Sequence, residues 1–156
     1  MAIYTFNNWG YEGALVAVEA DLRRGISAVD IVGLCDNTVA ESRERIRSAI
    51  INSGFEFPKE RVLLSLSPAD LKKEGAGFDL PLALSILSKA HELEKANIFC
   101  MGELILNGEI KGTRGVYSGL EEAKKAGIEY AIIPATSDVA PEGILVARVK
   151  DLKEAK

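Results

Sequence analysis

The stretch from Gly102 to Gly127, GELILNGEIKGTRGVYSGLEEAKKAG, decides the fold of this chain, because it joins a β-hairpin to an amphipathic helix. Apolar residues 104–106 run into Asn107-Gly108, the dipeptide that best suits the two positive-φ positions of a type I′ turn. Apolar residues then recur at helical spacing, at Val116, Leu120 and Ala123. Since glycine commonly follows a helix end, the pattern predicts a hairpin and then a helix that stops at Gly127.

Outward from this stretch, periodic apolar residues predict further elements. The predicted strands are 14–20, 28–33, 61–66, 130–133 and 144–149. The first two are expected to form an antiparallel hairpin around a turn at 23–25. A helix is expected to begin at Asn37 or Thr38 and to end at Asn52 or Ser53. The resulting order, β-β-α-β-α-β-β-α-β-β, is that of a mixed α+β fold.

A second predicted helix begins near Asp79, which is expected to cap it, with Pro81 in its first turn, where a missing N–H costs little. Its apolar residues cover two faces and leave a narrow polar stripe. A helix that is apolar on most sides is a buried one, so this helix should form the centre of the core.

Composition narrows the class of protein. At 156 residues, with 47% apolar and 27% charged residues, the chain is expected to form one domain, 1–156. A net charge of −4 argues against a nucleic-acid binder driven by bulk charge, although a local basic patch remains open. Cys35 and Cys100 make no disulfide framework, and we find no signal peptide or membrane-spanning run. A cytoplasmic protein is expected.

Motifs for cofactor chemistry are missing from the sequence. A P-loop requires Gly-Lys-Ser/Thr, which occurs nowhere, so the chain is not expected to hydrolyse ATP. His91 is the single histidine and the cysteines have no paired spacing, which argues against a metal site and against a Ser-His-Asp triad. We expect no metal and no cofactor in this chain.

Three segments carry a family resemblance. They are 30–58, with DIVGL and ESRERIRSAIINSGFEFP, 66–83, LSPADLKKEGAGFDLPLA, and 102–112, GELILNGEIKG. In this order they resemble the N-terminal domain of the ComM/YifB group of Mg-chelatase-like AAA+ proteins. The resemblance implies the ribosomal protein S5 domain 2-like fold of Lon proteolytic domains. It also implies a following AAA+ ATPase module, absent from this chain, to which ATP and Mg would belong. Some members act as hexameric branch-migration helicases in natural transformation.

The stretch 102–127 resembles the segment of Lon-type proteases that carries their catalytic lysine, and 73–81 has the layout of the loop that carries their serine before a buried helix. By position, Gly77 stands where the serine is expected and Tyr117 where the lysine is expected. A hydroxyl without a base is a weak nucleophile, so the neighbouring Ser118 does not restore the dyad. The resemblance therefore implies a non-catalytic domain that supports ring assembly and DNA handling. A divergent Lon-like serine hydrolase and a pure oligomerisation module remain alternatives.

Candidate site residues follow from this resemblance. The residues expected to contact phosphates are Arg43, Arg45, Arg47, Lys72, Lys73, Lys111 and Arg114. The arginines are equally typical of a solvated helix face. The residues of the family motifs expected to be structural are Gly75, Asp79, Pro81, Gly102, Glu103, Asn107 and Gly108. Glu103 is expected to pair with a basic residue of a loop. The expected partners are further copies of the chain in a ring, and DNA.

Overall fold

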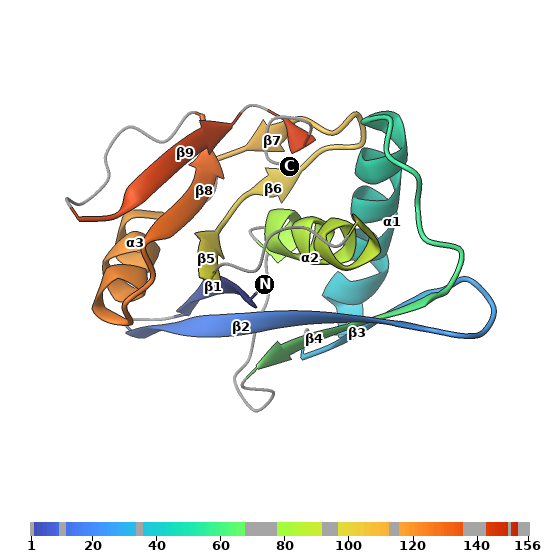
Figure 1. Ribbon diagram of the computed structural model, residues 1–156, viewed down its shortest axis with the longest axis horizontal. Coiled ribbons are helices and arrows are strands. Elements are labelled where there is room, and N and C mark those ends of the chain that lie inside the picture. The colour runs from blue at the N-terminus through green and yellow to red at the C-terminus, as the bar shows by residue number, and fades with distance from the viewer. Residues whose placement is uncertain are drawn as a thin grey trace.

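The computed structural model describes residues 2–9, 12–33, 36–67, 78–91, 97–112, 116–135, 143–149 and 151–152, and these form an α+β fold (Figure 1). The helices are α1 (Asp36–Asn52), α2 (Asp79–His91) and α3 (Val116–Lys125). The strands are β1 (Ala2–Trp9), β2 (Glu12–Arg23), β3 (Val29–Val32), β4 (Arg61–Ser67), β5 (Asn97–Cys100), β6 (Glu103–Leu104), β7 (Ile110–Lys111), β8 (Tyr130–Pro134) and β9 (Leu145–Val149). No helix within these ranges is long and apolar enough to cross a membrane.

A mixed sheet organises the fold, with the strand order β3-β4-β2-β1-β5-β8-β9. The strand β2 runs antiparallel to both of its neighbours, β1 and β4. The other pairs, β3–β4, β1–β5, β5–β8 and β8–β9, are parallel. The predicted α+β class with a mixed sheet is therefore confirmed.

The predicted hairpin of 14–20 with 28–33 is wrong, because β4 lies between β2 and β3. Residues Ala17 to Arg23 of β2 pair with β4, and β3 pairs with the other edge of β4. The buried side chains explain this order. Three residues of β4, Val62, Leu64 and Leu66, are fully enclosed, whereas β3 buries only Val29. The more apolar strand takes the interior position.

Two strands were not predicted at all, β1 and β5. In β1 the side chains of Ile3 and Thr5 are buried, and so is that of Phe6, which lies on the opposite face of the strand. Burial on both faces removes the alternation of apolar and polar residues that marks a half-buried strand.

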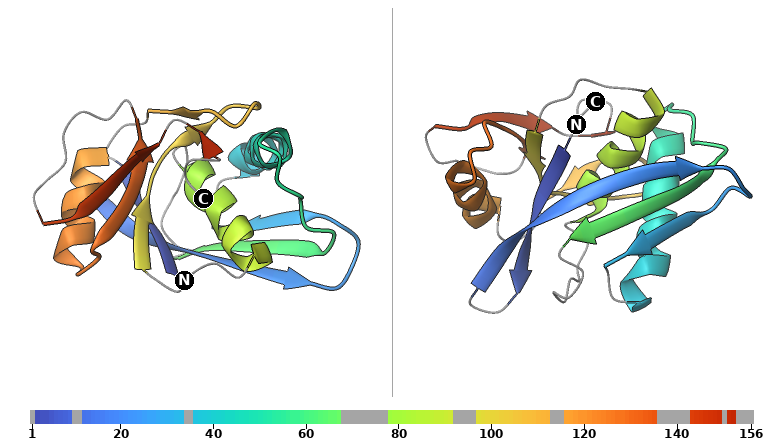
Figure 2. Two further views of the ribbon diagram at one scale, coloured as in Figure 1. Left: turned by 45° about the horizontal axis from the view of Figure 1, so that its top comes forward. Right: turned by 60° about the horizontal axis from the view of Figure 1, so that its bottom comes forward.

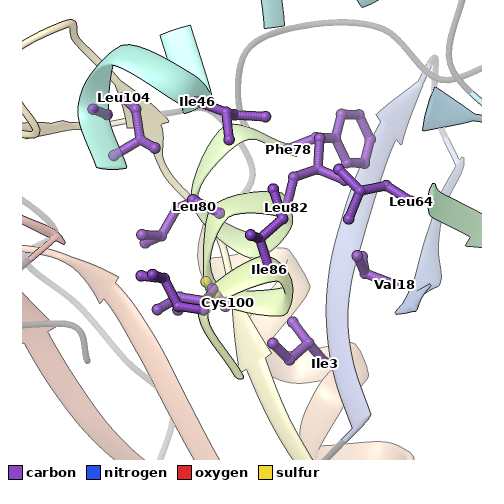
Figure 3. Packing of buried hydrophobic residues seen from close by; sticks show 14 of the residues in the cluster. Ile3, Val18, Ile46, Leu64, Phe78, Leu80, Leu82, Ile86, Cys100 and Leu104 are labelled. Atoms are coloured by element: carbon purple, nitrogen blue, oxygen red, sulfur yellow. The ribbon is translucent and has the colours of Figure 1, made fainter. Parts of the chain in front are cut away.

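Helices cover both faces of the sheet (Figure 2). On one face, α2 packs against β2 and β4 and α1 packs against α2. The side chains of α2 fill the centre of this core, as the sequence predicted (Figure 3). Residues Phe78 to Leu87 are all buried. On the other face, α3 packs on Phe6, Phe99 and Met101. Gly119 permits this close approach, since a Cβ there would lie 2.9 Å from Cβ of Phe6 and 3.1 Å from the sulfur of Met101.

The predicted hairpin of the opening stretch forms between β6 and β7, but its turn differs from the predicted type. The N–H of Gly108 donates to the carbonyl of Ile105 (2.9 Å), and the N–H of Ile105 donates to the carbonyl of Glu109 (3.1 Å). The loop is therefore one residue longer than a type I′ turn, with Gly108 at φ 96° in the position of a G1 bulge.

Candidate functional site

A buried carboxylate, that of Asp79, lies where α1, the first turn of α2 and the β6–β7 hairpin meet. The side chain of Asp79 has no exposed surface. Its Oδ2 accepts from Nε of Arg45 (2.7 Å) and from the backbone N–H of Leu104 (3.3 Å). Its Oδ1 accepts from Nη2 of Arg45 (3.2 Å) and from the hydroxyl of Ser42 (3.4 Å). One side chain thereby joins three elements.

This arrangement corrects the prediction that Asp79 caps its own helix. The carboxylate lies in the first turn of α2, but the hydrogen bonds that the structure shows for it run to α1 and β6. The guanidinium of Arg45 is partly buried and is held along one edge by Asp79, through Nε and Nη2, while Nη1 lies 3.8 Å from Glu41. Arg45 is therefore a structural partner of Asp79, which engages its Nε and Nη2 donors.

Electrostatics at this junction is set by burial. Burial raises the pKa of Asp79 to about 6, although the hydrogen bonds from Arg45 and from the amide of Leu104 lower it. The hydrogen bond to Asp79 raises the pKa of Arg45, against the effect of burial. The charge of Glu103 raises both pKa values. The contact favours the charged form of both partners, and the pKa of Asp79 is nevertheless raised because burial is the larger effect on this fully enclosed carboxylate.

The motif glycines fit closely around the junction. The carbonyl of Gly102 accepts from the N–H of Leu80 in the first turn of α2 (3.0 Å). A Cβ at Gly102 would lie 2.9 Å from Cγ2 of Ile110 and 3.1 Å from Cδ2 of Leu80. Gly108 lies against α1, where a Cβ would collide with the hydroxyl of Ser53. Both glycines let the hairpin approach the helices.

The remaining motif residues act locally. Pro81 is buried in the first turn of α2. Oδ1 of Asn107 accepts from the backbone N–H of Glu109 (2.9 Å), which fixes the hairpin turn. Glu103 is half-buried and lies opposite the exposed Lys111 in the β6–β7 ladder. Lys111 is thus the basic neighbour of Glu103 within the part of the hairpin that the structure describes.

The two other arginines of α1 are exposed. Nη1 of Arg43 donates to the carbonyl of Val29 in β3 (3.4 Å). The guanidinium of Arg47 lies over the ring of Phe57, 5.2 Å from its centroid, in a cation–π contact. These two side chains keep charge at the surface of α1.

Several predicted site residues lie outside the described residues. These are Lys72, Lys73, Gly75 and Arg114, together with Gly77 at the position of the Lon serine. Tyr117 and Ser118 are described, and both are exposed on α3. Within the described ranges, no group of three His, Cys, Asp or Glu side chains is placed to hold a metal ion.

Sequence reasoning missed a second basic group, at the end of the sheet. It consists of Arg23, Arg24, Lys59 and Arg61, all exposed around the loop from β2 to β3 and the start of β4. The available signal was the pair Arg23-Arg24 before Gly25, which was interpreted only as a turn. The cross-strand pair Arg23–Arg61 could not be foreseen while β4 was not placed beside β2.

Comparison with known proteins identifies the family. Residues 18–137 match the family model described as subunit ChlI of Mg-chelatase. The chain is 38% identical over 146 residues to the protein YifB of Salmonella typhimurium, covering 92% of this chain and 28% of that protein. It is 36% identical over 152 residues to YifB of Escherichia coli, covering 93% and 30%. It is 35% identical over 141 residues to the competence protein ComM of Haemophilus influenzae, covering 88% and 28%.

The chain thus spans less than a third of the length of these relatives. The match covers most of the described fold, from β2 to β8, and includes the Asp79 junction. The chain belongs to the Mg-chelatase ChlI family, in the group that includes YifB and ComM.

Proposed function

We propose that this chain is a non-catalytic accessory domain of a Mg-chelatase-like AAA+ protein, supporting ring assembly and DNA handling. We further propose that its fold is of the ribosomal protein S5 domain 2-like type found in Lon proteolytic domains. ATP and Mg would then act only in an AAA+ module. The competence protein ComM, by its name, links one relative to competence, which supports a role with DNA.

The observation that carries this proposal is the use of the motif residues at the junction. The carboxylate of Asp79 accepts hydrogen bonds from Arg45, Ser42 and the backbone of β6. Gly102 and Gly108 pack against neighbouring elements. These residues hold the helices and the hairpin together, a structural role that is consistent with a non-catalytic accessory domain.

The Lon-like positions support the same proposal. Tyr117 stands at the position of the Lon lysine and its side chain is 44% exposed. The neighbouring Ser118 is exposed and makes no hydrogen bond with any residue that the structure describes. An activated serine needs an adjacent base within hydrogen-bond reach.

Phosphate contact is proposed for exposed basic side chains near the junction. Arg43 and Arg47 are available on α1 and Lys111 on β7, with Lys72, Lys73 and Arg114 as further candidates from the sequence. Such contacts position a protein on the backbone of a nucleic acid without reading its bases.

DNA binding tests this proposal. Fluorescence anisotropy with labelled single-stranded and branched DNA, across a salt series, should show binding that weakens as salt rises. The triple variant Lys72→Ala/Lys73→Ala/Arg114→Ala should bind more weakly than the chain itself. A control of equal charge change, Lys89→Ala/Lys124→Ala/Lys125→Ala, should bind as the unaltered chain does. No binding even at low salt would reject the role with DNA.

Two further measurements separate the alternatives. Association that depends on protein concentration in sedimentation, without DNA binding, would favour a pure oligomerisation module. Turnover of a fluorogenic peptide or ester that Ser118→Ala abolishes would favour a divergent serine hydrolase. The proposal requires that neither substrate be turned over.

A further inference from the structure

The loop between β2 and β3 lies at one extreme end of the molecule, to the right of α1 in Figure 1 and at the right edge of both views in Figure 2. Residues 23–28 with the start of β4, 59–61, are here called the arm. At its tip, Ile26 is 87% exposed, the highest value among the large apolar side chains of the described residues. Gly25, with φ 147°, precedes Ile26 in the turn.

Basic side chains surround this tip. Arg23 and Arg61 face each other across the β2–β4 ladder, and the backbone of Gly25 approaches Cβ of Arg61. Arg24 and Lys59 are exposed beside them. Together with Arg43 of α1, whose guanidinium reaches the carbonyl of Val29, five basic groups gather at this end of the sheet.

Carboxylates compensate this charge only in part. Asp21 pairs with Arg23 (3.1 Å) and Asp30 pairs with Arg61 (2.7 Å). Both pairs are exposed, and exposed ion pairs are weak enough for a polyanion to replace the carboxylate. Glu60 is the third acid at this end of the sheet. Arg24 makes no ion pair with any residue in the described ranges, and its charge is available.

The base of the arm is held in place before any ligand binds. The N–H of Val62 donates to the carbonyl of Ala28 (2.8 Å), which ties the loop to β4. The β2–β4 ladder continues to its last pair, Arg23 with Arg61, and Arg43 fixes β3 to α1. Because these contacts order the backbone in advance, a ligand would meet preformed positions for its charges.

We propose that the arm is a nucleic-acid contact in which Arg24 and its basic neighbours bind phosphates while Ile26 enters the minor groove of a duplex. This inference rests on the proposed role with DNA and names a surface for it. A single apolar side chain flanked by arginines suits a groove edge, where architectural proteins insert apolar wedges between base steps. Four of the five basic groups are arginines, whose planar guanidinium suits phosphate oxygens.

A lipid surface fits the arm less well. One isoleucine buries far less apolar area than the acyl chain that, together with a basic patch, anchors a protein stably to a membrane. A protein interface usually has an apolar core that is depleted of charged residues. The four basic side chains around Ile26 leave no such apolar area.

The test compares three variants of the whole chain on the same labelled duplex. Arg24→Ala removes one proposed phosphate contact, and should weaken binding and lower the slope of log affinity against log salt by about 0.9. Ile26→Ser should weaken duplex binding without changing that slope. Lys124→Ala, an equal charge change on α3 at the other end of the molecule, should leave both affinity and slope unchanged.

Each result decides between the inference and the proposed function. If Lys72→Ala/Lys73→Ala/Arg114→Ala weakens binding while Arg24→Ala and Ile26→Ser do not, the arm is not the contact, although the proposed function stands. Absence of duplex binding by the unaltered chain at low salt rejects the inference, and absence of binding to single-stranded and branched DNA as well rejects the proposed role with DNA. Binding to vesicles of anionic phospholipid that Arg24→Ala and Ile26→Ser abolish, with duplex binding intact, assigns the arm to a membrane and overturns the inference.

Discussion

At Asp79, burial raises the pKa of the carboxyl group to about 6, although the hydrogen bonds from Arg45 and from the N–H of Leu104 lower it. In the unfolded chain this group would ionise near the ordinary pKa of an aspartate, 3.8. Between these two values the folded chain binds the proton more tightly than the unfolded chain does. Lowering the pH through this window therefore stabilises the fold, and the contribution is lost as the pH rises through about 6.

Replacement of Asp79 by asparagine tests this sign. Asp79→Asn removes the titrating group while keeping its shape. The variant should therefore lack the contribution of Asp79 to the pH dependence of the free energy of unfolding. From about pH 7 to about pH 5, the free energy of unfolding should rise by about 1 kcal/mol more in the unaltered chain than in the variant. Urea unfolding at both pH values measures the difference. A change of the opposite sign would show that Arg45 lowers the pKa more than burial raises it.

Arg45 permits a second prediction at the same contact. Arg45→Met leaves the buried Asp79 without its charged partner, and should destabilise the fold by about 2 kcal/mol, less than for a fully buried pair because the side chain of Arg45 is 22% exposed. The double variant Arg45→Met/Asp79→Leu removes both charges and should recover most of this loss. Urea denaturation of the two variants gives the comparison. A double variant no more stable than Arg45→Met would contradict the role of the unpaired charge.

At the scale of elements, close packing decides where glycine is needed. On α3, alanine at 119 would raise helix propensity by about 1 kcal/mol relative to glycine. Its Cβ would however press on Phe6, Phe99 and Met101, and overpacking of a core typically costs about 1–3 kcal/mol. Gly119→Ala should therefore lower the melting temperature, while Ser118→Ala, exposed on the same helix, should change it little. A stabilised Gly119→Ala would mean that α3 shifts freely on the sheet.

Elements with a regular pattern could be predicted from the sequence, and contacts between distant elements could not. The buried helix α2 could be predicted because apolar residues occupy most positions of its first two turns. Arg45 and Asp79 are 34 residues apart, and spacing alone grouped Arg45 with the exposed arginines of α1. The order of β2, β4 and β3 depends on which strand is most apolar on the core face, a property of the whole sheet.

At the scale of the whole molecule, one apolar cluster lies on each face of the sheet, and the same strands contribute side chains to both clusters. The cluster on the side of α1 and α2 contains Ile86, and the cluster on the side of α3 contains Ile133. Neither side chain has exposed surface. Since β1 and β5 contribute residues to both clusters, we expect the two sides to unfold in one cooperative transition.

Two matched deletions of one methylene test this cooperativity. Ile86→Val and Ile133→Val should each lower the free energy of unfolding by about 1 kcal/mol, the usual cost of this change in a core. Because the residues lie on opposite faces of the sheet and share no cluster, the double variant should lose the sum of both, about 2 kcal/mol, within about 0.5 kcal/mol. Urea unfolding followed by far-UV circular dichroism and by fluorescence should give coincident curves. Separate transitions would show that the two faces of the sheet do not unfold as one unit. A double variant whose loss departs clearly from the sum would show that the two sites are coupled through the sheet.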